Sequence, residues 1–135
     1  MNQFYKYFAI LLLTTLAFSC NSNSKSTNTK SNNPPKFVLT NDYYDFGTVK
    51  YGEILSYSFK YYNKGQTPLI IKKAEVGCGC TTVNYKKQPL ASNDSSFIEI
   101  IFDTKGWNGV QYKQISIFTN ERDIASNIIV KATIE

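Results

Sequence analysis

Two cysteines, Cys78 and Cys80, flank Gly79 and form the part of the sequence most suited to chemistry. On an extended chain, residues two apart point to the same face, so the two thiols project side by side. Their Cα atoms would lie about 6.5 Å apart, which is twice the rise of a strand residue and within the upper range for a disulfide. This spacing suits a disulfide, thiol exchange or a soft metal ion.

The sequence leaves four hypotheses for this pair open. The first is a disulfide or dithiol that only shapes the end of a strand, and so short a ring would add little stability. The second is a thiol-exchange or redox-sensing role, which nearby ammonium groups would favour by lowering a thiol pKa. The third is two-coordinate Cu(I), since zinc usually takes four ligands, and the fourth is two free, buried thiols. The nearby lysines are Lys72, Lys73, Lys86 and Lys87.

The chain contains no histidine, and this absence excludes several kinds of enzyme. A Cys–His nucleophile, a Ser–His–Asp triad and an imidazole metal ligand all need that residue. The carboxylates Asp42, Asp45 and Glu53 are scattered and are expected to be solvated surface groups. A net charge of +5 is spread along the chain, without the clustered Lys and Arg of a nucleic-acid site. We therefore expect no enzyme activity, no cofactor and no nucleic-acid partner.

The amino-terminal segment predicts export and lipid attachment. An apolar stretch of about a dozen residues, Phe8 to Phe18, follows Lys6, which is typical of a secretory signal. It is too short for a membrane-spanning helix, which needs roughly 20 apolar residues. The segment Leu16-Ala17-Phe18-Ser19-Cys20 resembles the lipobox of bacterial lipoproteins, in which the cysteine is acylated. We therefore expect residues 1–19 to be a lipoprotein signal peptide and Cys20 to be a membrane anchor.

Residues 20–35 are expected to be the acylated cysteine followed by a flexible linker. The segment from Asn21 to Pro35 is rich in Ser, Asn, Thr and Lys, so it buries too little apolar surface to offset its ordering entropy. A coil of about 15 residues spans roughly 20 Å, which would hold a folded domain off the bilayer. No acidic cluster of the kind that serves as a surface-export signal follows Cys20. The predicted location is the bacterial cell envelope, on the outer membrane and facing the periplasm.

From residue 36 to residue 135 the pattern is that of β-strands. Apolar and polar residues alternate, as from Leu55 to Tyr61 and from Ile128 to Ile134, and no segment keeps a helical period. About seven short strands within roughly 100 residues predict an all-β fold, a single antiparallel immunoglobulin-like β-sandwich, with a closed barrel as the alternative. The strand-like stretches are residues 37–39, 43–49, 55–61, 69–76, 81–85, 98–103, 115–117 and 128–134.

Several motifs of this region occur together and in a fixed order. The most specific is Cys78-Gly79-Cys80-Thr81-Thr82. The others are Asp45-Phe46-Gly47-Thr48-Val49, Gly52, Phe59, Asn63-Lys64-Gly65, Pro68-Leu69-Ile70-Ile71, Pro89-Leu90, Phe102-Asp103, Gly109, Lys113, Ile115 and Asn120. With these motifs the region resembles the DUF1573 family, immunoglobulin-like domains related to those of ciliary and centrosomal ASPM/SPD-2/Hydin-type proteins.

Two positions depart from the family pattern. Ala91-Ser92-Asn93-Asp94 replaces the usual Pro-Gly-Glu type turn, and Tyr85 stands where a tryptophan is common. Neither change affects the expected fold. The resemblance implies a small exported or lipid-anchored β-domain, and it implies no particular activity.

Trp107 is the candidate for an exposed aromatic contact, because it lies in the loop-like stretch from Asp103 to Gly109. Most of the other aromatic residues are expected to pack in the core or to pair across strands. The predicted function is that of a lipid-anchored, non-enzymatic binding or scaffolding module. Its partners would be the membrane, through Cys20, and an envelope protein or a glycan. The alternative is a thiol redox or Cu(I)-handling protein that acts through Cys78 and Cys80.

Overall fold

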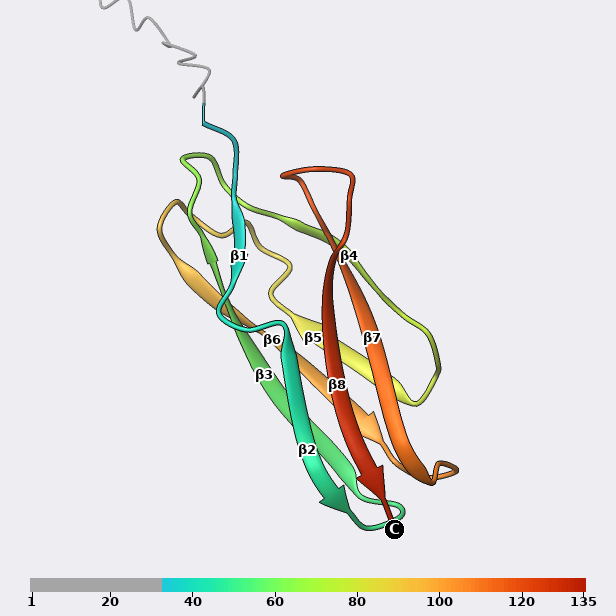
Figure 1. Ribbon diagram of the computed structural model, residues 1–135. Helices are drawn as coiled ribbons and strands as arrows, with labels where there is room; N and C mark the ends of the chain where they lie inside the picture. The colour runs from blue at the N-terminus through green and yellow to red at the C-terminus, as the bar shows by residue number, and fades with distance from the viewer. Residues whose placement is uncertain (1–32) are drawn as a thin grey trace, which may run out of the picture. The chain divides into compact units, whose positions relative to one another are not determined.

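Residues 33–135 are described by the computed structural model, and they form eight β-strands and no helix (Figure 1). The predicted signal peptide, the lipid anchor at Cys20 and most of the predicted linker lie outside this part of the chain. The strands are β1 (Phe37–Leu39), β2 (Tyr43–Val49), β3 (Ile54–Asn63), β4 (Ile71–Val76), β5 (Thr81–Tyr85), β6 (Ser95–Asp103), β7 (Gly109–Thr119) and β8 (Ser126–Ile134).

The strands form two sheets of four, in the orders β1-β3-β6-β5 and β2-β8-β7-β4. Side chains along β3, β6, β7 and β8 alternate between buried and more exposed positions, as expected for sheets that cover a core on one face. The first order matches the A-B-E-D sheet of an immunoglobulin domain. The predicted all-β, immunoglobulin-like sandwich is therefore confirmed, and the barrel alternative is wrong.

The antiparallel arrangement of the sandwich has one exception. β2 runs parallel to β8, with Tyr43 opposite Ile129 and Val49 opposite Ile134. The reason is a crossing between the sheets at residues 40–42, where the backbone bonds first to Lys60 of β3 and then to Ile129 of β8. The first strand of the sandwich is thereby split into β1 and β2, one in each sheet, and these two strands coincide with the separate strand-like stretches expected at residues 37–39 and 43–49.

The core lies between the sheets and contains two groups of buried side chains. The larger one is built from inward residues of the central strands, such as Phe59, Ile98, Ile115 and Val130. The smaller one consists of Phe102, Ala132 and Ile134, and Cys80 and Trp107 are among the residues that pack against it. Burial of apolar surface on this scale is the main favourable contribution to folding.

The strand predicted from residue 69 begins at Ile71 instead. Leu69 forms an isolated bridge with Leu90, in which each backbone N–H donates to the other residue's carbonyl oxygen, at 2.9 and 2.8 Å. Leu69 and Leu90 are both buried. The apolar run therefore divides between this bridge and β4, because residues 69 and 71 have different pairing partners.

Candidate functional site

The chain crosses from β4 in one sheet to β5 in the other through the cysteine segment. Cys78 and Cys80 are joined by a disulfide, and their Cα atoms are 5.3 Å apart. This distance is shorter than the expectation for an extended chain because the segment forms a turn, in which the Thr81 N–H donates to the Cys78 carbonyl oxygen at 3.4 Å. The thiol-exchange and Cu(I) hypotheses stay predictions.

The disulfide borders a surface cavity of about 220 Å³. Cys78 lines this cavity, whereas Cys80 packs against the small group of Phe102, Ala132 and Ile134. Trp107 lines the same cavity and is half-buried, with its apolar contacts on that same group. The full lining, called the disulfide cavity below, is Gly77, Cys78, Thr81, Trp107, Tyr112, Lys113 and Gln114. The structure thus brings together Cys78 and Trp107, which the sequence selected for unrelated reasons.

Lys113 also lines this cavity, and the sequence indicated it only as one of the family's motif residues. It is 9% exposed, and its Nζ lies 3.2 Å from the centroid of the Trp107 ring and 5.0 Å from that of Phe102. Its Nζ donates a hydrogen bond to Oε1 of Gln111 at 3.2 Å. Burial lowers the pKa of the Lys113 ammonium. The ring faces offset part of this cost, because they attract a cation electrostatically.

The two-residue period of the strand would have predicted that the side chain of Lys113 points inward. Ile115 and Ile117 are inward residues of β7, and residue 113 precedes them at the same spacing. A lysine at an inward position of a strand is uncommon, since lysine is almost never fully buried. The sequence prediction placed this strand at residues 115–117, so it stopped short of the informative position.

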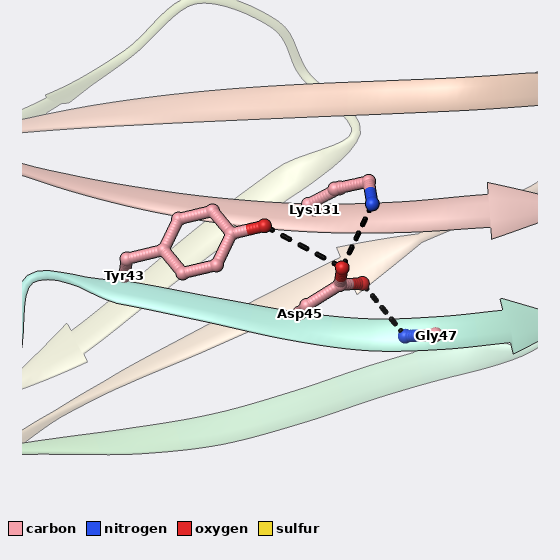
Figure 2. Close-up of polar contacts among 4 residues, drawn as sticks. All are labelled: Tyr43, Asp45, Gly47 and Lys131. Carbon is pink, nitrogen blue, oxygen red and sulfur yellow. Dashed lines mark hydrogen bonds and ion pairs between the residues drawn. The ribbon is translucent and has the colours of Figure 1, made fainter.

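A second cluster surrounds Asp45 on the outer face of the β2-β8-β7-β4 sheet (Figure 2). Oδ2 of Asp45 accepts hydrogen bonds from Lys131 Nζ at 2.8 Å and from the Tyr43 hydroxyl at 3.4 Å. Oδ1 accepts the backbone N–H of Gly47 at 2.8 Å. Gly47 has a φ of +73°, a conformation that glycine adopts without steric cost. Asp45 therefore joins β2 to β8 and orders the bulge in β2, and it is more than a solvated surface carboxylate.

The hydrogen bond from Lys131, followed by that from the Gly47 N–H, lowers the pKa of Asp45 below its ordinary value of 3.8. A carboxyl whose folded pKa is depressed stabilises the fold above its unfolded pKa, and this stability is lost as the pH falls through the folded pKa. We expect Asp45→Asn to lower the urea midpoint at about pH 7, and we expect that deficit to shrink by about half or more near pH 3. Urea unfolding at the two pH values measures the difference.

Glu99 supplies the control for this prediction. The pKa of Glu99 is also lowered, by hydrogen bonds from Asn84 and Ser56, and Glu99 lies on the other sheet. The Glu99→Gln variant should therefore keep the acid sensitivity that Asp45 contributes. A deficit of Asp45→Asn that is the same at both pH values would contradict the assignment.

Two stacked sheets with the strand order of an immunoglobulin domain, and a cavity at the crossing between them, define this chain as an immunoglobulin-like β-sandwich module. Residues 37–134 match the family described as "Protein of unknown function (DUF1573)", and the chain belongs to that family. No curated protein matches the chain.

Solved structures with similar folds come from varied proteins. A protein of unknown function from Porphyromonas gingivalis W83 is 23% identical, with a TM-score of 0.64 over 73% of this chain and 46% of its own. The PapD-like domain 7 (ASH) of human CEP192 is 13% identical, with a TM-score of 0.58 over 76% of this chain and 87% of its own. The secreted serine protease VesC from Vibrio cholerae is 14% identical, with a TM-score of 0.55 over 75% of this chain and 23% of its own. At these identities the likeness concerns the fold alone, and this chain spans less than half the length of the Porphyromonas and Vibrio proteins.

Proposed function

We propose that this chain is a non-enzymatic binding module that a lipid on Cys20 holds at a bacterial envelope membrane, where it faces the periplasm. The observation that carries the binding role is the disulfide cavity. It combines the features of a ligand site, namely a concave surface, the half-buried aromatic side chain of Trp107 and one buried charge. Its ligand would belong to an envelope protein or a glycan.

The lipobox-like segment that ends at Cys20 supports the anchor. Each buried CH₂ of an attached acyl chain contributes about 0.8 kcal/mol to membrane binding, and two chains give stable attachment. Within residues 33–135 no helix meets the length and apolarity needed to cross a bilayer. The polar sequence between Cys20 and the sandwich would let the module reach partners about 20 Å from the membrane surface.

Labelling with an alkyne analogue of palmitate in a bacterial host tests the anchor. We expect the wild-type chain to carry the label and to pellet with membranes, and we expect Cys20→Ala to lose the label and at least about tenfold of the membrane-bound fraction. The double variant Cys78→Ser/Cys80→Ser is the matched control, since it removes two thiols and leaves Cys20 in place. A Cys20→Ala chain that keeps the label would refute the anchor.

The second candidate function is thiol–disulfide exchange through Cys78 and Cys80. The position of Cys78 on the lining of an open cavity favours it, because exchange requires a thiolate to approach a disulfide sulfur. Among the described residues no group of three or more His, Cys, Asp or Glu side chains is arranged to hold a metal ion. A Cu(I) role would therefore require the reduced pair by itself.

A further inference from the structure

The disulfide cavity lies beside a strand edge that pairs with no other strand of residues 33–135. β4 pairs with β7 only as far as Val76 and Ile115, because the chain then leaves the sheet at Gly77 and crosses toward β5 (Figure 1). Residues 109–114 of β7 continue beyond this point and pair with β8 alone. Tyr112, Lys113 and Gln114 belong to this half-paired stretch and also line the cavity. An open edge of this kind offers backbone donors and acceptors to an extended ligand.

The cavity also contains a single, incompletely compensated charge. Lys113 is the only charged residue in its lining, and the other lining residues are neutral. The ion pairs found within residues 33–135 involve Lys72, Lys73 and Lys131, so Lys113 takes part in none of them. Its side chain meets two aromatic rings and the neutral oxygen of Gln111. An ammonium group has three donors, and the bond to Gln111 uses one of them. A carboxylate would accept a further hydrogen bond and would add the attraction of opposite charges.

From these observations we propose that the disulfide cavity binds a carboxylate group, with Lys113 as its charge partner and with Trp107 as a wall. A volume of about 220 Å³ equals roughly seven water molecules at about 30 Å³ each. This space accommodates a carboxylate with a short substituent, and the rest of a larger ligand would lie outside the cavity. The carboxylate belongs either to a free small acid or to the end of an extended peptide that lies along residues 109–114. The inference rests on the proposed binding function and names the chemistry of the ligand.

Trp107 provides the signal for the test, because it is the only tryptophan of the chain and lies on the cavity wall. The full-length protein in detergent is titrated with three ligands. Two are acids, N-acetyl-alanine and N-acetyl-tetra-alanine, and the third is the C-terminal amide of N-acetyl-tetra-alanine. We expect the acids to change the Trp107 emission saturably, and we expect the amide to bind at least about tenfold more weakly than the matching acid. An acid and an amide that bind equally would overturn the proposal, and so would an absence of binding by both acids.

Variants of two lysines complete the design. Lys113→Met should weaken the acid at least about tenfold, whereas Lys113→Arg should restore part of the affinity. Lys86→Met is the matched control, because Lys86 is exposed and lies outside the cavity lining, and it should bind as the wild type does. A Lys113→Met chain that unfolds cooperatively and binds the acid with wild-type affinity would also overturn the proposal. The amide comparison uses the wild-type chain and so holds even where a variant fails to fold.

The two sources of carboxylate give different results in the same titration. Equal affinity for the two acids identifies a small free acid as the ligand, and an affinity at least about tenfold higher for tetra-alanine identifies an extended peptide on the edge of β7. Failure of the carboxylate inference is separable from failure of the proposed function, because saturable binding that is equal for acid and amide would keep the binding role and exclude the carboxylate as the recognised group. Labelling of Cys20 reports on the anchor without reference to the cavity.

Discussion

Replacing Gly65 with alanine is expected to destabilise the domain by about 3 kcal/mol or more, which is a large part of the roughly 5–15 kcal/mol by which domains are stable. Gly65 is buried in the turn that follows β3. A Cβ atom there would lie 2.6 Å from both the backbone nitrogen of Lys36 and the Cα of Pro35, and nearer still to the carbonyl oxygen of Pro34. All three atoms belong to the backbone, so no side-chain rotation can relieve the overlap.

The turn cannot move away from this contact, because hydrogen bonds hold it on both sides. The N–H of Lys64 donates to the carbonyl oxygen of Lys36 at 2.9 Å, and the hydroxyl of Ser92 donates to the carbonyl oxygen of Gly65 at 2.7 Å. Pro35 is itself buried against the domain. The end of the segment predicted as a linker is therefore packed on the sandwich at this point. The Gly65→Ala variant must break this junction or lose the turn.

Gly79→Ala is the matched control for Gly65→Ala. An added Cβ at Gly79 meets no atom within 4 Å, and the φ of Gly79 is not positive. Such a replacement changes stability by less than about 1 kcal/mol, because it removes backbone freedom from the unfolded chain without introducing a clash. Urea unfolding of the two variants and the wild type gives the comparison. Equal stabilities for Gly65→Ala and Gly79→Ala would disprove the close approach of residues 34–36.

The alternation of apolar and polar residues was enough to predict the fold class, because residues two apart lie on the same face of a strand and the buried face is therefore apolar at every second position. Buried and more exposed residues alternate along β3, β6 and β8. Phe59, Ile98 and Val130 lie at inward positions of these strands and are fully buried. Pairing between distant strands has no comparable local signature. The parallel association of β2 with β8 joins residues more than 80 positions apart, such as Tyr43 and Ile129, and the sequence did not reveal it.

In the candidate site, too, the sequence identified residues from their neighbours in the chain but not the contacts between residues far apart in the chain. Cys78, Cys80 and Trp107 were selected from local composition, and the structure places Cys78 and Trp107 on one cavity. Lys113 completes that cavity, but its inward position depends on where β7 begins, and the sequence prediction began that strand too late. Asp45 looked like an isolated carboxylate because Lys131, its ion-pair partner, is 86 residues away.

Asn63 is the residue at which a second large loss of stability is expected. Its side chain is completely buried and makes four hydrogen bonds to the backbone. Nδ2 donates to the carbonyl oxygens of Thr67 at 2.8 Å and Leu90 at 3.1 Å. Oδ1 accepts the N–H groups of Lys36 at 3.2 Å and Gly65 at 3.0 Å. The sequence indicated a turn at Asn63-Lys64-Gly65, but the partners at residues 36 and 90 lie far away along the chain.

We expect Asn63→Ala to destabilise the fold by about 3 kcal/mol or more. Each buried polar group that loses its partner costs about 1–3 kcal/mol. This replacement removes four hydrogen bonds, two of them buried, although the Leu90 carbonyl keeps its bond from the Leu69 N–H and water entering the space would recover part of the loss. Asn127→Ala is the control. Asn127 is exposed, and its side chain accepts a hydrogen bond from the Ser116 hydroxyl. A surface change of this kind usually stays within about 0.5 kcal/mol. Chemical denaturation of both variants measures the difference.

Asn63→Asp separates the two halves of this network. The carboxylate keeps two oxygens for the N–H groups of Lys36 and Gly65, but it faces the carbonyl oxygens of Thr67 and Leu90 without a proton to donate. Burial beside these oxygens should raise the pKa of the new carboxyl above its unfolded value of about 3.9. The protonated form is then the favoured one in the folded state, so the deficit of Asn63→Asp should decrease as the pH is lowered through the folded pKa toward the unfolded pKa. Asn63→Ala has no such group and should show no recovery, and an identical pH dependence for the two variants would mean that the donors of Asn63 do not hold residues 67 and 90.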